Sequence, residues 1–125
     1  QIYFVLESLS EHYKIALASS SSLNTINTAL AQADLRKYFT FIVSGEQFKE
    51  SKPNPEIYLH TIKELNVNKD EAIIIEDSPK GILAANRAGI KVLALKDDKF
   101  GLDQSQADII INELNDIIKL IEKGA

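Results

Sequence analysis

The stretch from Ile73 to Ile82, with the sequence IIIEDSPKGI, constrains the fold more than any other part of the chain. Its three successive isoleucines predict a strand buried on both faces, which ends where the acidic pair begins. Ser78 is a suitable N-cap and Pro79 a suitable first residue for a helix, whose apolar residues recur at helical spacing until a glycine ends the run. Glu76 and Asp77 therefore lie at the carboxyl end of a strand, where parallel α/β sheets bind their ligands.

The acidic pair is a candidate metal site. Adjacent carboxylates repel each other unless a cation or hydrogen bonds offset their charges, and a hard divalent cation such as Mg²⁺ takes oxygen ligands of this kind. Glu76 and Asp77 are therefore candidate ligands. The residues alone leave a second interpretation open, in which Asp77 helps to cap the helix and Glu76 points to solvent.

Strands and helices are expected to alternate along the whole chain. The patterns predict strands at residues 13–18, 38–44, 71–75, 91–95 and 108–111. They predict helices at residues 2–9, 55–65, 79–88 and 113–123, and a helical stretch after Ser22 that passes through Ile26, Leu30 and Leu35. Such alternation favours an α/β fold whose parallel sheet is wound with right-handed crossovers.

Two further polar segments follow predicted strands. Ser19–Ser22 separate a strand from a helix, an arrangement that can direct backbone N–H groups at an anion, although a serine run is more commonly only a loop and an N-cap. Lys52 lies in Ser51–Pro55, where two prolines stiffen the base of a loop, although a lone lysine is normally a solvated charge. His12 is expected to be exposed at a helix end, and His60 to pack or to face solvent.

Composition excludes several functional classes. The chain of 125 residues is 45% hydrophobic and 26% charged, which is typical of one soluble domain. Its net charge of -4, with both signs interspersed, provides no basic stripe for nucleic acid or an anionic membrane. The absence of cysteine excludes disulfides, thiolate nucleophiles and zinc-thiolate sites, and a cytoplasmic location is the simplest interpretation. Because the chain starts at Gln1 and contains no methionine, we expect a piece of a longer protein.

Three stretches together resemble the haloacid dehalogenase superfamily, in particular its β-phosphoglucomutase and phosphoglycolate phosphatase-like branch. They are residues 15–21, 51–58 and 73–90, which follow the order of the family's motifs and span nearly the whole chain. The resemblance implies a Rossmann-like parallel sheet with helices on both faces. It also implies Mg²⁺-dependent phosphoryl transfer, by a phosphatase or a phosphomutase, on a small phosphorylated metabolite such as a sugar phosphate.

The resemblance assigns a role to each polar segment. The Ser19 hydroxyl would donate a hydrogen bond to the transferred phosphoryl group, with the Ser20 backbone N–H beside it. Lys52 would neutralise the phosphoryl oxygens and the charge of the nucleophile. Asp77 and Glu76 would hold Mg²⁺, either directly or through water.

One motif of the family is absent. Its enzymes form an aspartyl-phosphate on the first aspartate of an Asp-x-Asp motif, and this chain has no such motif in the required place. The nearest match begins at Asp97-Asp98, lacks the one-residue gap, and is expected to be a solvated turn. The cap domain that selects substrate would also precede Gln1, which leaves residues 1–12 as its exit helix.

The missing motif implies an incomplete sheet. In the family, the nucleophile strand lies between the strand that ends at Ser19 and the strand that ends before Asp77. Without it, these neighbours must pair with each other, with a second chain or with a segment outside this sequence, because buried unpaired backbone groups cost about 1 to 3 kcal/mol each. Residues 1–125 are therefore expected to be the C-terminal part of the core domain, inactive on their own.

The sequence leaves two other interpretations open. The chain could be a non-catalytic phosphate-binding or assembly module of the same fold, but the missing methionine and the retention of Ser19, Lys52 and the acidic pair argue against it. A dehalogenase or phosphonate hydrolase of the same superfamily is the third interpretation. The metal-binding acids disfavour the dehalogenase, because a carbon–halogen bond presents no phosphoryl charge to neutralise.

Overall fold

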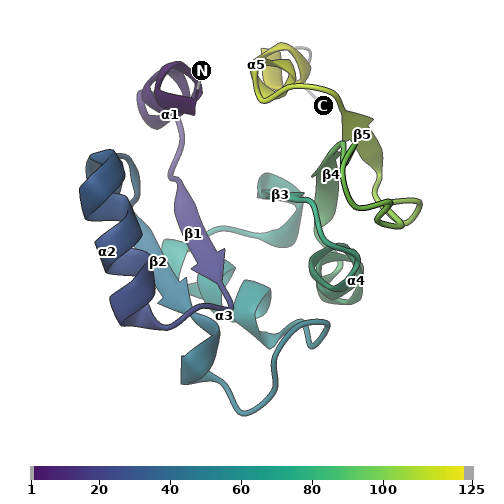
Figure 1. Ribbon diagram of the computed structural model, residues 1–125, viewed down its shortest axis with the longest axis horizontal. Coiled ribbons are helices and arrows are strands. Elements are labelled where there is room, and N and C mark those ends of the chain that lie inside the picture. The colour runs from purple at the N-terminus through teal and green to yellow at the C-terminus, as the bar shows by residue number, and fades with distance from the viewer. Residues whose placement is uncertain (1, 123–125) are drawn as a thin grey trace.

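The computed structural model describes residues 2–122, which form two parallel sheets that lie side by side (Figure 1). The first sheet contains β1 (Ala16–Ser19) and β2 (Phe41–Ser44). The second contains β3 (Ile73–Glu76), β4 (Lys91–Leu95) and β5 (Ile109–Ile111), in that order. All the strand pairs are parallel, so within each sheet the carboxyl ends of the strands lie at one edge.

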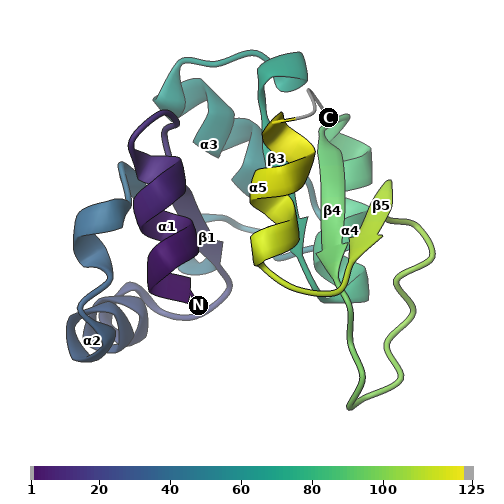
Figure 2. The same cartoon turned by 90° about the horizontal axis from the view of Figure 1, so that it is seen from above.

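Five helices among the described residues precede, connect or follow the strands and cover both faces. They are α1 (Ile2–Ser10), α2 (Leu23–Ala33), α3 (Glu56–Leu65), α4 (Pro79–Ala88) and α5 (Asn115–Glu122). In Figure 2, α1 and α5 lie in front of the strands, and α3 and α4 lie behind them. This arrangement confirms the predicted α/β fold with helices on both faces. Within residues 2–122, no helix is both long enough and apolar enough to cross a membrane.

One hydrophobic core joins the two sheets. Most of its buried members come from β2, α3, α4 and β4, and they include Val43, Ile57, Tyr58, Ile82, Ala85 and Val92. Helices α3 and α4 contact each other on one side of the strands, and α1 contacts α5 on the other. The two sheets are thus held together through their helices, since β1 and β3 exchange no strand hydrogen bonds in the described part of the chain.

The open edges of β1 and β3 agree with the predicted gap in the sheet. The prediction that the central strand is buried on both faces is wrong, because Ile75 is 38% exposed and Ile73 and Ile74 are only partly buried. The physical reason is that no strand among residues 2–122 covers this edge of β3. In the described part of the chain, the two edges therefore have no strand partner, and another strand could pair with them.

The predicted boundaries of α4 are confirmed in detail. The Ser78 hydroxyl accepts a hydrogen bond from the Gly81 N–H at 3.1 Å, and Pro79 is the first helical residue. Gly89 ends the helix with φ of 73°, a left-handed conformation that costs glycine little. Both ends of the helix are thus set by local chemistry that the sequence displays.

Other predicted boundaries need correction. The first strand begins at Ala16, three residues later than predicted. The second begins at Phe41 because Arg36–Tyr38 form a 3-10 turn, and the central strand begins at Ile73 because Lys69–Glu71 form another. The last strand begins one residue late, the last helix begins two residues late, and the predicted end of that helix at Lys123 lies outside the described residues.

Candidate functional site

A buried ion pair joins the two sheets. The Lys52 ammonium lies 3.1 Å from Oε2 of Glu76, and the two side chains are only 10% and 13% exposed. The same Nζ atom lies 3.4 Å from the backbone oxygen of Ala18. Because Ala18 belongs to β1 and Glu76 to β3, Lys52 contacts both sheets near their carboxyl ends.

Tyr58 contacts both members of this ion pair. Its hydroxyl donates a hydrogen bond to Oε2 of Glu76 at 2.6 Å. Its ring centroid lies 5.1 Å from Nζ of Lys52, within the range of a cation–π interaction. Tyr58 is itself buried in the core on α3, so the rigid body of the protein fixes the position of its hydroxyl.

The other oxygen of Glu76 lies against the start of α4. Oε1 accepts hydrogen bonds from the Asp77 N–H at 3.1 Å and from the Ser78 N–H and hydroxyl at 3.5 and 3.4 Å. Gly81 makes room for this arrangement, because a methyl group at that position would overlap the carboxyl group of Glu76. Both carboxylate oxygens of Glu76 are therefore engaged.

These contacts keep Glu76 ionised and Tyr58 protonated. Burial favours a higher pKa for Glu76, but the Tyr58 hydrogen bond, the charge and hydrogen bond of Lys52 and the Asp77 N–H together hold its pKa below the ordinary value. Burial and the nearby Glu76 carboxylate raise the pKa of Tyr58 far above its ordinary range. At neutral pH the cluster is thus a carboxylate that accepts from an ammonium and a phenol.

Asp77 differs from Glu76 in its surroundings. Its side chain is exposed and has no hydrogen-bond or ion-pair partner within residues 2–122. With Ile75, Glu76 and Leu95 it lines a shallow hollow of about 180 Å³ at the carboxyl end of β3 and β4. A free carboxylate that borders a hollow fits the chemistry of a ligand for a hard cation.

Of the two acidic residues, Asp77 is therefore the better candidate to bind Mg²⁺. No three His, Asp or Glu side chains of the described residues are grouped so that they could hold a metal by themselves. Asp77 could supply one ligand, whereas Glu76 is held by Lys52, Tyr58 and backbone N–H groups. The assignment of both acids to the metal stays a prediction.

The serine loop is organised by its own hydrogen bonds. The Ser19 hydroxyl oxygen accepts from the Ser21 N–H at 3.1 Å, and the fully buried Ser44 hydroxyl donates to the Ser21 carbonyl at 2.6 Å. Ser22 caps α2 by accepting from the Thr25 N–H at 3.1 Å. Ser22 is thus the N-cap of α2, and the serines before it form the loop between β1 and that helix.

The first turn of α2 has a further partner from the same chain. Oε1 of Glu46 accepts a hydrogen bond from the Leu23 N–H at 3.3 Å. Any phosphate-binding role of this segment would therefore lie with Ser19 and the exposed Ser20, which precede the helix. That role stays a prediction.

The structure brings the predicted site residues together near the carboxyl ends of β1 and β3. Two further residues of this region were not predicted from the sequence. Lys52 contacts Glu76 directly, Asp77 is adjacent, and Ser19 follows the carbonyl that Lys52 approaches. Tyr58 was missed as a member of the site, although its place on the first turn of the helix after the prolines was a usable signal. The other is Gln104, in the loop between β4 and β5, which carries no sequence signal that separates it from other loop residues.

Three other polar residues behave as expected. His12 is exposed just beyond α1. The His60 ring packs between two aromatic rings, with centroids 6.0 Å from Phe41 and 5.4 Å from Phe48. Asp97 organises a turn by accepting hydrogen bonds from backbone N–H groups within the next five residues.

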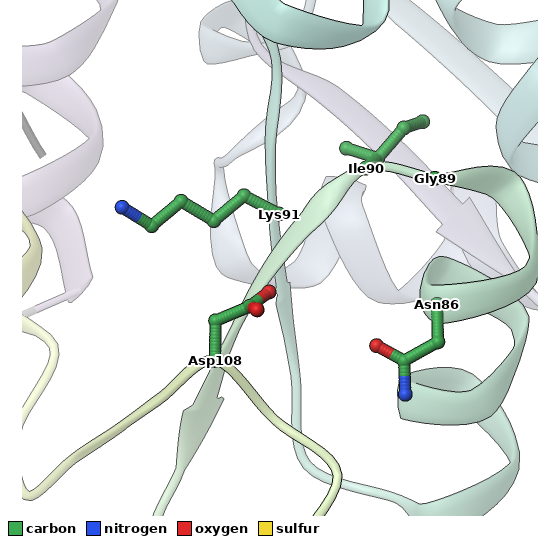
Figure 3. Close-up of a pocket in the computed structure, with 5 residues that line it drawn as sticks. All are labelled: Asn86, Gly89, Ile90, Lys91 and Asp108. Carbon is green, nitrogen blue, oxygen red and sulfur yellow. The ribbon is translucent and has the colours of Figure 1, made fainter.

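A second hollow lies at the opposite, amino end of β4 (Figure 3). It encloses about 410 Å³ and is lined by Asn86, Gly89, Ile90, Lys91 and Asp108. Two of its polar side chains bind the backbone, because Asp108 accepts from the Val92 N–H at 2.8 Å and Asn86 donates to the Gln106 carbonyl at 3.2 Å. These contacts fix the segment before β5, and the hollow lies away from the Lys52 cluster.

The structure has the α/β fold, with parallel strands and helices on both faces, that the motifs anticipated. Residues 1–95 match the family model described as haloacid dehalogenase-like hydrolase, and the chain belongs to this family.

Curated relatives include phosphatases. The chain is 37% identical over 116 residues to a phosphorylated carbohydrates phosphatase of Thermotoga maritima, with 93% of this chain and 47% of the relative covered. It is 30% identical over 123 residues to a phosphoglycolate phosphatase of Aquifex aeolicus, with 98% and 58% covered. The chain thus spans about half the length of these relatives.

Solved structures agree with the fold. A crystal structure from Thermotoga maritima, of a protein provisionally assigned as a β-phosphoglucomutase, superposes with a TM-score of 0.85 and 32% identity. The match covers 98% of this chain and 58% of that one. The arrangement of strands and helices in nearly the whole chain is therefore shared with this solved structure.

The hydrogen bond from Tyr58 to Glu76 can be tested by removal of one oxygen. We expect Tyr58→Phe to lower the free energy of unfolding by about 1.5 to 3 kcal/mol, because the lost bond is made to a buried charged group. The exposed Tyr13, changed to Phe, is the matched control and should alter stability by less than about 0.5 kcal/mol. Urea denaturation measures both, and equal effects would contradict the role given to Tyr58.

The lowered pKa of Glu76 predicts a pH-dependent contribution to stability. A carboxyl group whose folded pKa is below its unfolded value, 4.5 here, stabilises the fold above that value and loses the contribution as pH falls through the folded pKa. We therefore expect Glu76→Gln to destabilise the protein at neutral pH and the difference from wild type to shrink as the pH falls below 4.5.

The control for this experiment is Glu64→Gln, which changes an exposed glutamate of α3. Its stability should run parallel to wild type across the same pH range in urea denaturation. A difference between wild type and Glu76→Gln that stays constant with pH would show that ionisation of Glu76 does not support the fold.

Proposed function

We propose that this chain is part of a Mg²⁺-dependent phosphatase or phosphomutase that acts on a small phosphorylated metabolite such as a sugar phosphate. The observation that carries the proposal is the cluster of Lys52, Glu76 and Tyr58 beside the free Asp77 carboxylate, at the carboxyl ends of β1 and β3. The names of the curated relatives, which include phosphatases for phosphorylated carbohydrates and phosphoglycolate, support the substrate class.

Lys52 is the group that would bind the phosphoryl oxygens. An ammonium has three hydrogens, and the contacts to Glu76 and to the Ala18 carbonyl account for two of them. The third remains for a phosphoryl oxygen. The ion pair and the Tyr58 ring hold the ammonium in place, so little reorganisation is needed when charge develops on the transferred group.

The hydroxyl of Ser19 is the second candidate donor. Its oxygen accepts from the Ser21 N–H, and its own hydrogen has no acceptor among residues 2–122. A phosphoryl oxygen beyond the end of β1 could take that hydrogen bond, with the exposed Ser20 beside it. The two donors would then approach the group from neighbouring loops.

Asp77 would supply a ligand to Mg²⁺. Glu76 would bind the cation through water, or would contribute only by its ion pair with Lys52. When bound, the cation would neutralise charge on the phosphoryl oxygens. The nucleophile is proposed to be an aspartate outside this chain, carried by a strand that pairs with the open edges of β1 and β3. Its carboxylate would attack phosphorus as the bond to the leaving oxygen breaks, and water or an acceptor hydroxyl would then take the phosphoryl group.

We expect the 125-residue chain alone to show no turnover. The test incubates it with Mg²⁺ and either p-nitrophenyl phosphate or sugar phosphates and measures release of inorganic phosphate. If the gene encodes an Asp-x-Asp segment upstream of residue 1, we expect the extended protein to show turnover. Turnover by the chain alone would contradict the proposal, and a start codon immediately before residue 1 would favour a non-catalytic phosphate-binding module.

In the extended protein, Lys52→Met should lower kcat/KM by about 100-fold or more, as expected for the loss of a preorganised group that stabilises transition-state charge. Lys49→Met, which removes an exposed charge from the same loop, is the control and should leave kcat/KM within about twofold. Circular dichroism would establish that both variants fold. Equal activity of the two variants would show that Lys52 has no part in the mechanism.

The cytoplasmic location of the protein remains a prediction.

A further inference from the structure

Gln104 is a buried glutamine in the long loop between β4 and β5. Although its neighbours in the loop are exposed, it is only 7% exposed. Its Nε2 atom donates to the Asp77 carbonyl at 2.9 Å and to the Leu95 carbonyl at 2.8 Å, and its Oε1 atom accepts from the Asp97 N–H at 3.0 Å. One side chain thus connects the ends of two strands and the start of the loop.

The chemistry of these partners fixes the orientation of the amide. Two carbonyl oxygens require two donors, and the NH₂ group of Gln104 has two hydrogens. In the reverse orientation, the amide oxygen would face both carbonyl oxygens and the NH₂ group would face the Asp97 N–H. The side chain therefore has one arrangement that satisfies its buried partners, and it holds the backbone at Asp77 by direct contact.

The loop that Gln104 anchors is itself ordered. The Asp97 carboxylate accepts from the N–H groups of Lys99 and Phe100 at 3.1 Å and from that of Leu102 at 2.8 Å. Figure 2 shows this loop beyond the carboxyl end of β4, and Phe100 on it is 78% exposed. Through Gln104 and Asp97, the loop and the Asp77 backbone form one hydrogen-bonded unit.

We infer that Gln104 is a positioning residue that fixes the Asp77 backbone and couples its position to the loop of residues 97–103. Asp77 lies between the end of β3 and the N-cap of α4, so neither strand nor helix hydrogen bonds hold its carbonyl. Gln104 supplies the donor that is otherwise missing. The importance of this position for turnover rests on the proposed function, whereas the coupling itself does not.

The coupling is tested by hydrogen exchange in the 125-residue chain. Gln104→Met keeps the length of the side chain but removes its hydrogen bonds, and Gln106→Met is the matched control, because that side chain is exposed and makes no bond within residues 2–122. We expect faster amide exchange in peptides covering both residues 75–80 and residues 97–103 for the Gln104 variant alone. Faster exchange confined to the loop would overturn the inference.

A second variant guards against loss of the fold. Gln104→Asn retains the amide but is one methylene shorter, so it cannot reach all three partners. We expect the same faster exchange at residues 75–80 and 97–103, with less disturbance of packing. If both variants were unfolded, Gln104 would be a structural residue of the core and the positioning role would be overturned. Ile111→Val, a conservative change of a buried residue in β5, reports what a general loss of stability does to exchange at residues 75–80.

The consequence for turnover is tested in the extended protein. We expect Gln104→Met to lower kcat by about tenfold with KM changed less than about twofold, as found when a supporting hydrogen bond behind a metal ligand is lost. Gln106→Met should match wild type. An unchanged kcat for Gln104→Met in an active enzyme would overturn the positioning role. Absence of phosphatase activity in the wild type would refute the proposed function, and the hydrogen-exchange result alone would then decide the inference.

Discussion

The buried contact between Lys52 and Glu76 is the interaction on which the arrangement of this molecule depends. Transfer of two charges out of water is favourable only where other hydrogen bonds complete the coordination, and loss of one partner from such a pair typically costs about 3 to 5 kcal/mol. Tyr58, the Ala18 carbonyl and the start of α4 provide that completion. The contact therefore requires β1, α3 and β3 to be in place together.

The dependence also runs in the other direction. Lys52 can reach both sheets because two prolines stiffen its loop and α3 begins directly after them. The first turn of α4 receives the carboxyl group of Glu76 because Ser78 caps that helix. The geometry of the polar cluster thus depends on the first turns of α3 and α4. The apolar core beneath it fixes these turns relative to one another.

Local signals in the sequence predicted the elements whose ends depend on a few neighbouring residues. Ser78, Pro79 and the glycine at position 89 set the bounds of α4, and β4 begins and ends where its apolar run predicted. The strand that was predicted to begin at Tyr38 begins later, because that residue closes a 3-10 turn through a hydrogen bond to the Leu35 carbonyl. Apolar composition alone does not distinguish such a turn from a strand.

The candidate site was predictable in its residue types but not in its contacts. Lys52 and the acidic pair could be identified from their motifs, yet their direct ion pair depends on the distance between two loops. Gln104 resembles the nearby Gln106 in sequence and differs only because the returning chain places it under the strand ends. The exposure of Ile75 likewise depends on which strands are neighbours, which hydrophobic patterning does not encode.

The glycine at position 81 links two positions that seem independent along the chain. Glycine is about 1 kcal/mol less favourable than alanine in a helix, so local propensity alone would favour alanine here. The volume that the missing methyl group leaves is occupied by the carboxyl group of Glu76. In a library that varies both positions, larger residues at 81 should therefore survive only together with a shorter side chain at 76, and the two sites would vary as one.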